Sequence, residues 1–501
     1  MVGVEFEQNL LSKIIDLLSY NCDQPMIFSS GIFLLLFCGF MVIYSTLQHR
    51  NNLRILYVIA FSLYFYYKSS GLYLVLLLFS AVSDYSIGHA IASRKSQSSK
   101  AWYVALSVAI NLGMLIYFKY TNFFIELSSG LFGEGFLEFQ NIFLPVGISF
   151  FVFQSMSYTI DIYRAKIEPL NRFADYLFYL SFFPQLVAGP IVRAKDFIPQ
   201  IRKPLHVSRD MLAVAVFLIV TGLFKKAIIS DYISLNFVDR VFDEPILYSG
   251  FESLMAIYGY ALQIYCDFSG YSDMAIGLAL MLGFKFPKNF NAPYKSATIT
   301  EFWRRWHISL SSWLRDYLYI SLGGNRKGKI RTYFNLAITM ILGGLWHGAA
   351  IRFVLWGALH GTALALHKMW LSISPRAKTD GSQMSFMGRL MGIILTFNLV
   401  CLGWLLFRAD SMETVRIMLH QIFTNFNAGL IPQFVAGYVA IVAIFILGYL
   451  LHFLPSRLNT WACRLLARGG FVLQAIVIVV TIWCVMQMKS SEIQPFIYFQ
   501  F

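Results

Sequence analysis

The sequence predicts an all-α integral membrane protein with many spans, and two observations carry this prediction. Of the 501 residues, 57% are hydrophobic and only 13% are charged, whereas soluble domains carry about 25% charged residues. Apolar runs of about 20 residues, the length that crosses a bilayer as a helix, recur along the whole chain. We therefore expect a polytopic membrane protein with about 11 or 12 transmembrane helices.

The apolar runs follow one another without a low-complexity linker or an obvious repeat, which favours a single membrane domain over residues 1–501. A further run at 333–348 is short and is interrupted by Gly343 and Gly344. The runs of spanning length fall near 27–47, 52–67, 70–90, 101–119, 141–163, 210–229, 251–283, 353–370, 388–407, 433–453 and 469–488.

The net charge of +14 fits the same class of protein. Most Lys and Arg residues flank apolar runs, as they do in cytoplasmic loops that face anionic headgroups. We therefore expect a lipid bilayer as the partner of these residues, and no nucleic acid.

Loop charges predict the orientation of the spans. Basic residues follow the first and third runs, for example Arg50 and Arg94, so both loops should be cytoplasmic. The loops at 121–140 and 231–244 are acidic and should lie outside, whereas 164–172 and 455–468 are basic and should lie inside.

Two segments do not fit a simple alternation of spans. Both 174–192 and 284–331 should begin and end on the cytoplasmic side, and the first contains Pro184, Gly189 and Pro190. Non-helical backbone at membrane depth is tolerated only where protein buries it or water lines it. We expect re-entrant or in-plane elements here, and such elements often build a site.

The second of these segments predicts an amphipathic helix. Thr298 and Glu301 have the spacing of a capping box, so a helix should begin there. At helical spacing, Trp303, Trp306, Leu310, Trp313, Leu314 and Tyr317 form one stripe, with Arg305, Ser309, Ser312 and Asp316 facing the other way. His307 falls at the edge of the stripe. It is either a functional group or a structural histidine of an interface helix.

The run Gly343 to Ala350 carries His347 between glycines, which let backbone or substrate approach its imidazole closely. Histidine is the one side chain that accepts a proton near pH 7 without a perturbed environment. His347 is therefore a candidate general base. The alternative is a histidine bonded to a neighbouring helix, with glycines that serve tight packing.

Two carboxylates lie within one apolar run, in the stretch Tyr265 to Asp273. Asp267 and Asp273 must be paired or must line a water-filled cavity, because isolated charges in a membrane are costly. Candidate partners are Arg193 and the pair Arg304 and Arg305. A structural ion pair and a polar substrate tunnel both explain the pattern.

A metal site is not predicted. His360 and His367 share a helix face, but no carboxylate or cysteine stands at a spacing typical of zinc ligands. We interpret His360 as a residue that serves packing or polar contacts. GxSxG and P-loop motifs are also missing, so a serine hydrolase or an NTPase has no support.

At these residues the chain resembles the membrane-bound O-acyltransferase (MBOAT) family, and within it the bacterial alginate O-acetyltransferase-like group. The matching stretches concentrate at about 150–370. They are Ser181 to Arg193, Tyr265 to Asp273, Asn289 to Tyr294, Glu301 to Gly324 and Gly344 to Gly348, together with the terminal Pro495 to Phe501.

The resemblance implies the MBOAT fold, in which spans surround a central tunnel. It also implies that His347 is the catalytic histidine and that His307 is a second important position. Family members of this group work with a separate periplasmic SGNH-type acetyltransferase. The substrate or tunnel candidates are Arg193, Asp267, Ser269, Asp273, Arg304, Arg305, Trp313, Asp316 and Trp346.

We expect acetyl groups to enter from a cytoplasmic donor, acetyl-CoA, near the basic segments 193–209 and 285–331, with no bound cofactor. The Lys and Arg residues there suit a phosphorylated donor. The expected location is a bacterial inner membrane, beside machinery that makes or exports a polysaccharide such as alginate or cellulose. Open alternatives are peptidoglycan O-acetylation, D-alanyl transfer to teichoic acid, and a non-enzymatic transporter of a glycan or solute.

Overall fold

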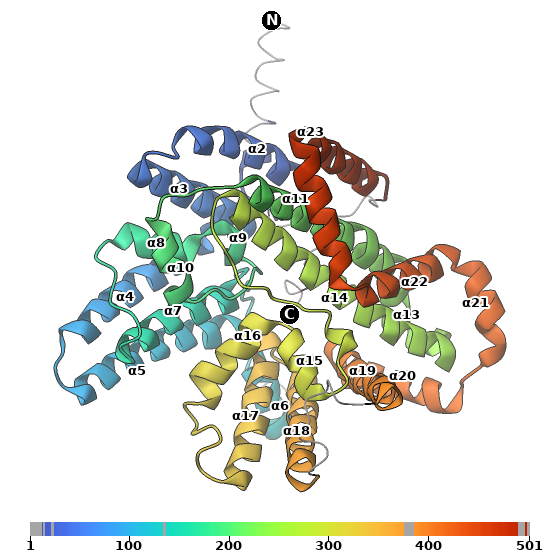
Figure 1. Ribbon diagram of the computed structural model, residues 1–501. Coiled ribbons are helices and arrows are strands. Elements are labelled where there is room, and N and C mark those ends of the chain that lie inside the picture. The colour runs from blue at the N-terminus through green and yellow to red at the C-terminus, as the bar shows by residue number, and fades with distance from the viewer. Residues whose placement is uncertain are drawn as a thin grey trace, which may run out of the picture. The chain divides into compact units, whose positions relative to one another are not determined.

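The computed structural model describes residues 16–21, 25–133, 137–374 and 385–488, together with Lys13, Phe496 and Ile497. Glu134 of the predicted outer loop and most of the C-terminal stretch lie outside the described residues. Within the described residues all regular structure is helical (Figure 1), which confirms the predicted fold class.

The chain divides into two compact units, which are described separately. The first comprises residues 1–206 and 282–286. Within it, helices α4, α5 and α7 pack against one another, and α8 packs against α3 and α4. Its elements are α2 (Gly31–Thr46), α3 (Asn51–Ser70), η1 (Gly71–Tyr73), α4 (Leu74–Ser93), α5 (Gln97–Leu115), η2 (Ile116–Tyr120), α6 (Thr121–Phe132), α7 (Ile148–Tyr163), α8 (Phe173–Ser181), α9 (Phe183–Leu186) and α10 (Ala194–Ile201).

The second unit comprises residues 207–281 and 287–501. Helix α14 packs against α11, and α17 packs along α18, as Figure 1 shows. Its elements are α11 (Arg209–Leu223), η3 (Phe224–Ser230), α12 (Asp231–Ile233), η4 (Ser234–Val238), α13 (Asp239–Asp243), η5 (Pro245–Leu247), α14 (Gly250–Met281), η6 (Pro293–Lys295), α15 (Ile299–Arg305), α16 (Ile308–Trp313), η7 (Leu314–Tyr319), α17 (Lys329–His347), α18 (Ile351–Ile373), α19 (Phe386–Arg408), α20 (Met412–Thr424), η10 (Ala428–Leu430), α21 (Ile431–Gly437), α22 (Val439–Phe453) and α23 (Ser456–Met488).

Every predicted apolar run coincides with at least one helix. Among the described residues, five helical stretches are long and apolar enough to cross a membrane, or six if the pair bent by 97° at residue 438 counts as one span. This count is lower than the predicted crossings partly because α3 and α4 run on as one stretch and because α2 has only 16 residues. The number of crossings therefore stays a prediction.

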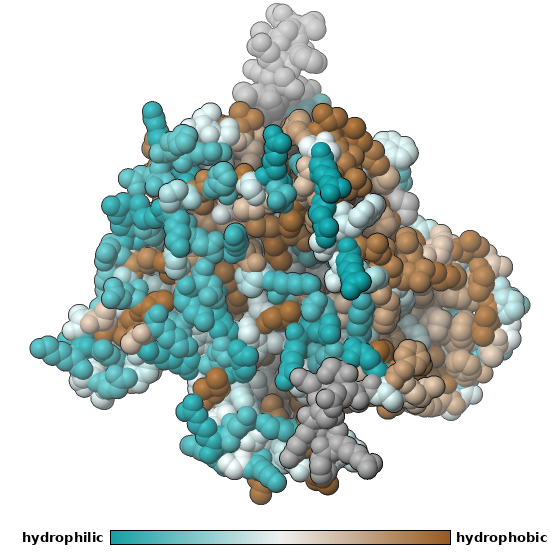
Figure 2. Space-filling view, viewed as in Figure 1, coloured by the Kyte–Doolittle hydropathy of each residue, from teal (hydrophilic) through white to brown (hydrophobic). Residues whose placement is uncertain are grey.

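Exposed apolar side chains mark the surfaces that suit lipid. On α22, Val439, Ile446 and Leu450 are each more than half exposed. Figure 2 shows brown side chains over the neighbourhood of α21 and α22. Exposed apolar side chains that gather on one surface mark a contact with protein or membrane, so these helices suit a bilayer environment.

The predicted broken element at 174–192 is present in the first unit. Helix α8 ends at Ser181, the short α9 follows, and the backbone from Val187 to Arg193 is non-helical. The whole stretch from Tyr176 to Val192 is buried. Protein therefore covers this irregular backbone, as its polar groups require.

The continuous amphipathic helix predicted over 303–317 is wrong. The capping-box start is confirmed, since the side chain of Thr298 accepts a hydrogen bond from the amide of Glu301 at 3.1 Å. Helix α15 then ends at Arg305, and His307 has a left-handed backbone with φ 41° and ψ 57°. The physical reason is a distant loop, because the amide of Ile308 donates to the carbonyl of Asn289 at 2.8 Å.

The two glycines that interrupt the apolar run at 333–348, Gly343 and Gly344, lie within a helix. Helix α17 runs through both glycines and ends at His347. A β-carbon on Gly344 would overlap the carbonyl oxygen of Phe353 in α18. Gly344 therefore permits the close approach of α17 and α18, whereas a β-carbon on Gly343 would lie 3.1 Å from the side chain of Leu314 in η7.

Candidate active site

His347 is the last residue of α17, and the turn that follows it is short because α18 begins at Ile351. Its side chain lies among three aromatic rings, with the residue only 3% exposed. The ring centroids of Trp346, Trp356 and Phe407 lie 4.9, 5.1 and 5.2 Å from that of His347. The imidazole is thus held at a helix end inside an aromatic enclosure.

His307 lies at the junction of α15 and α16 and is completely buried. The imidazole packs edge-on against Phe268 of α14 at 4.6 Å and stacks on Phe290 at 6.3 Å. This placement differs from the predicted position at the edge of an interface helix. The break in the helix turns His307 into the protein.

The hydrogen bonds around Asn289 fix the tautomer of His307. The side-chain oxygen of Asn289 accepts from the amide and hydroxyl of Ser309, so this oxygen is an acceptor. His307 Nδ1, 3.1 Å from the same oxygen, must then donate its proton to it. The lone pair consequently lies on Nε2, which is buried and has no hydrogen-bond partner among the described residues.

Trp346 joins the two histidines. Its ring centroid lies 6.1 Å from that of His307 and 4.9 Å from that of His347. A buried nitrogen without a partner is rare in folded proteins and calls for an explanation. The hydroxyl of an incoming ligand would supply that partner by donating to Nε2, so the region around Trp346 can host proton transfer.

Asp267 and Asp273 are paired, but not with the arginines that were predicted. Lys226 Nζ lies 2.5 Å from Asp267 and 2.8 Å from Asp231, whereas Lys225 Nζ lies 2.6 Å from Asp273. Both lysines belong to η3, the π-helical continuation of α11. Sequence reasoning assigned them only to the end of an apolar run.

Glycine contacts explain why these lysines reach α14. A β-carbon on Gly270 would lie 2.7 Å from the carbonyl oxygen of Gly222, and the reverse distance is 2.6 Å. The two backbones therefore cross in near contact, which places the side chains of Lys225 and Lys226 against α14. The structural ion pair, one of the two interpretations of these carboxylates, is the arrangement found.

The remaining candidates have contacts or positions of their own. Arg305 binds Glu301 at 2.8 Å, Asp316 binds its neighbour Arg315 at 2.7 Å, and Arg304 is exposed. Ser269 and Trp313 are buried, with the Trp313 ring 5.1 Å from Tyr317. Arg193 begins α10 in the first unit.

His360 was missed as a site residue. It is completely buried beside Trp356 and Trp303, with centroid distances of 4.7 and 5.2 Å. Neither ring nitrogen has a hydrogen-bond partner among the described residues. The predicted packing role is therefore present, and Trp356 links this ring to the enclosure of His347. His367 instead contacts Thr300, 2.7 Å from its Nδ1.

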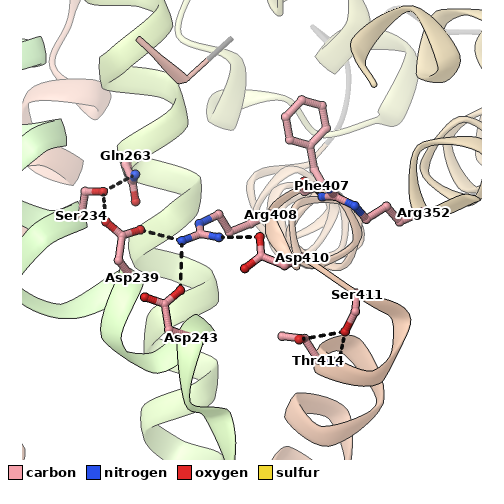
Figure 3. A network of polar contacts seen from close by, with 10 residues as sticks. All are labelled: Ser234, Asp239, Asp243, Gln263, Arg352, Phe407, Arg408, Asp410, Ser411 and Thr414. Atoms are coloured by element: carbon pink, nitrogen blue, oxygen red, sulfur yellow. Dashed lines mark hydrogen bonds and ion pairs between the residues drawn. The ribbon is translucent and has the colours of Figure 1, made fainter. Parts of the chain in front are cut away.

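A polar network behind the enclosure was also missed (Figure 3). Arg408 Nη2 lies 2.8 Å from Asp239 and 3.8 Å from Asp243, and Nη1 lies 3.4 Å from Asp410. Arg352 donates to the carbonyl of Phe407 at 2.9 Å. These bonds fix the end of α19 and with it the Phe407 ring against His347.

The C-terminal stretch contributes two described residues. The amide of Ile497 donates to Asp267 at 3.0 Å, and the Phe496 ring packs 5.6 Å from Phe268. Phe268 in turn contacts His307. Phe496 and Ile497 thus pack against the part of α14 that contacts His307.

Comparison with known proteins identifies relatives that cover most of the chain. The model of the membrane-bound O-acyltransferase family, MBOAT, matches residues 163–403. The chain is similar to the "Probable alginate O-acetylase AlgI" of Azotobacter vinelandii, with 40% identity over 80% of this chain and 78% of the relative. A protein of the same name from Pseudomonas putida is 35% identical over 95% of this chain and 100% of the relative.

A third relative is the "Peptidoglycan O-acetyltransferase" of Helicobacter pylori, 34% identical over 78% of each chain. The family match covers the helices that carry both histidines. The match, the apolar helices and relatives of this length lead to one conclusion: the chain belongs to the membrane-bound O-acyltransferase family and is an acyltransferase.

Proposed function

We propose that this acyltransferase passes acetyl groups from cytoplasmic acetyl-CoA across a bacterial inner membrane, for O-acetylation of an extracytoplasmic polysaccharide. The observation that carries the proposal is the pair of buried histidines on either side of Trp346. The names of the relatives support the acetyl group, because alginate and peptidoglycan enzymes among them are both O-acetyl enzymes.

The proposed chemical step is acyl transfer to a hydroxyl. His347 takes the proton from the accepting hydroxyl, whose oxygen attacks the acetyl carbonyl. The carbon–sulfur bond of the thioester then breaks, and the thiolate of coenzyme A leaves and recovers the proton. The lone pair of His307 Nε2 accepts a hydrogen bond from the acceptor or orients it, and the aromatic walls exclude water.

Exposed basic residues support entry of the donor beside the second unit's loops. Lys288 and Lys327 are exposed in the segments that the loop charges place on the cytoplasmic side. Cationic side chains raise the local concentration of a phosphorylated donor. We therefore assign the donor entrance to these loops and the acceptor to the opposite side.

The acceptor is a serine of a periplasmic SGNH-type partner, which passes the acetyl group to the sugar. Machinery that synthesises or exports the polysaccharide completes the assembly. Peptidoglycan is the second candidate acceptor, because the relative from Helicobacter pylori carries that name. Transfer of D-alanine to teichoic acid is the remaining enzymatic alternative.

The proposal is tested in membranes of a deletion strain that expresses the chain with its partner. Vesicles receive acetyl-CoA labelled in the acetyl group, and label is measured on partner, polysaccharide and peptidoglycan. We expect label on the partner and polysaccharide, and none with His347→Ala. Label on peptidoglycan alone would exclude the polysaccharide, and label on none of the three would exclude acetyl transfer.

Orientation is tested by labelling single cysteines on a Cys-free background in intact cells. We expect an impermeant reagent to reach residues of 126–138 and 235–246 and to miss those of 94–100 and 326–331. Outside labelling of Lys327→Cys would reverse the proposed donor side. The control is the same set of variants in permeabilised cells, where every position should react.

A further inference from the structure

An open pocket of about 440 Å³ lies at the start of α3, and none of its lining residues is assigned to acyl transfer. We call it the arginine pocket. All its lining residues belong to the first unit. They are Arg50, Asn51, Asn52, Leu53, Arg172 and Arg202.

Hydrogen bonds hold two of the guanidinium groups of this pocket, those of Arg172 and Arg202, in place. Arg202 binds Asp175 with two parallel hydrogen bonds of 2.6 Å, from Nε and Nη2. Its third nitrogen, Nη1, donates to the side-chain oxygen of Asn52 at 3.1 Å. Arg172 donates to that same oxygen at 3.3 Å. One amide oxygen thus receives two guanidinium groups, as an oxygen of a phosphate would.

The pocket carries an excess of positive charge. Arg54, one turn along α3, is 1% exposed, and its guanidinium donates only to the carbonyls of Gln48 and Ile201. Within the described residues, Arg50, Arg54 and Arg172 have no carboxylate partner. Asp175 neutralises Arg202 alone. A buried cation without a counter-ion favours an anion nearby.

The backbone adds to this preference. α3 has 20 residues, and Arg50, its N-cap, makes no capping hydrogen bond with its side chain. The first amides of a helix lack intrahelical acceptors and carry the positive end of the helix dipole. Here they belong to Asn51, Asn52 and Leu53, which line the pocket. Amides and guanidinium groups together suit a phosphate better than a carboxylate-sized anion.

We propose that the arginine pocket binds a phosphate group at the membrane surface. Two sources supply this chemistry, an anionic phospholipid headgroup and a soluble phosphate ligand. Leu53 and Leu56 on the outer side of α3 are 47% and 55% exposed, so acyl chains could lie beside the pocket. Figure 2 shows hydrophilic side chains gathered over α3, α8 and α10, as expected of a surface that meets headgroups.

Variants are chosen so that the fold survives. Neither Arg50 nor Arg172 has an acidic partner in the described part of the chain, so Arg50→Gln with Arg172→Gln removes two charges without stranding a described carboxylate. Arg202 is left in place, because its loss would leave Asp175 buried and unpaired. Arg94→Gln is the matched control, an exposed arginine of the same unit whose bond goes to Tyr103.

The lipid arm uses native mass spectrometry of the full-length protein, titrated with phosphatidylglycerol and, in parallel, phosphatidylcholine. We expect tighter binding of phosphatidylglycerol. The affinity for phosphatidylglycerol should fall in the double variant by about tenfold or more per guanidinium lost, because a hydrogen bond to a charged group contributes a free energy of that size. Arg94→Gln should bind as the wild type does.

The soluble arm compares thermal unfolding in sodium phosphate and sodium chloride at equal ionic strength. In one outcome, phosphate raises the unfolding midpoint of the wild type but not that of the double variant, while the wild type shows no preference for phosphatidylglycerol. That combination would assign the pocket to a soluble phosphate ligand. Asn52→Asp is the second variant, since its carboxylate would occupy both arginines and abolish either response. Equal behaviour of wild type and both pocket variants in the two arms would overturn the proposal.

Discussion

The two histidines of the candidate site are positioned in contrasting ways. His347 ends a regular 19-residue helix that packs along α18 through Gly344. His307 lies at a break between two short helices, in a left-handed conformation that only a few per cent of non-glycine residues adopt. Regular secondary structure secures the first, and side-chain hydrogen bonds from Asn289 secure the second.

Because of this difference, substitutions of the two histidines should have different effects on the backbone. Replacing the His347 side chain removes one imidazole at the end of a regular helix, whose backbone has helical geometry up to that residue. Replacing His307 disturbs a backbone geometry as well as an imidazole. Loss of activity in a His347 variant therefore reports loss of the imidazole, whereas in a His307 variant it can also report a changed backbone.

The largest expected effect is that of His347→Ala on acetyl transfer. Loss of a general base typically lowers the rate by about 10² to 10⁴. The amount of protein in the membrane should not change, because the helix continues to be held by its glycine contacts. Acetyl ester on the glycan of a complemented deletion strain is the measurement. Exposed His420, changed to Ala, is the control, and near-normal acetylation in His347→Ala would remove the catalytic assignment.

Next in size is the effect of Gly344→Ala on stability. The added β-carbon would overlap the carbonyl of Phe353, and overpacking of this kind costs about 1–3 kcal/mol. Unfolding of the purified protein by heat should show a lower midpoint, with activity reduced in step.

The matched control for this change is Gly39→Ala in α2. A β-carbon there meets nothing within 4 Å, so the substitution should stabilise the helix by roughly 0.5–1 kcal/mol. Equal midpoints for the two variants would refute the idea that glycine contacts hold α17 against α18.

Asn289→Ala should affect the His307 region and the bond that Asn289 Nδ2 donates to the hydroxyl of Ser272 in α14 at 3.0 Å. It removes the acceptor of two hydrogen bonds from Ser309 and the partner of His307 Nδ1. Unsatisfied buried donors cost about 1–3 kcal/mol. Asn289→Asp retains the acceptor oxygens and should recover most of the stability. If Asn289→Ala keeps both full activity and the wild-type unfolding midpoint, Asn289 does not position His307.

The smallest expected change in stability is that of His307→Asn. Asparagine tolerates the left-handed conformation, so the break should persist. His307→Ala should be less stable than His307→Asn by about 1 kcal/mol, while both lose activity because neither has the Nε2 lone pair. His307→Gln retains polar groups but does not titrate near neutral pH, so wild-type acetylation in that variant would assign His307 a structural role.

Local signals in the sequence predicted much of the architecture. Each predicted apolar run contains at least one helix, and the cap at Thr298 starts α15 where its spacing indicated. The break at His307 could not be predicted, because Trp303, Trp306 and Leu310 keep helical spacing across it. The hydrogen bonds that cause the break are accepted by Asn289, which lies 18 residues before His307.

The candidate site divides in the same way. The sequence singled out His347 and His307 as the chemical groups, and their contact through Trp346 is a matter of packing. The partners of Asp267 and Asp273 were mistaken because charge alone does not distinguish Lys225 and Lys226 from Arg193 or Arg304. The crossing of Gly222 with Gly270 selects the lysines.

By itself, then, the sequence determined the membrane class, the helical segments and the two histidines. These features depend on amino-acid composition and on patterns that repeat every few residues, so residues close together in the sequence are enough to specify them. Tertiary structure decided the tautomer of His307, the ion pairs of α14, the aromatic enclosure of His347 and the arginine pocket. Each of these joins segments far apart in the chain, and the physical reason is that burial makes every polar group depend on whichever distant partner the packing brings within hydrogen-bond reach.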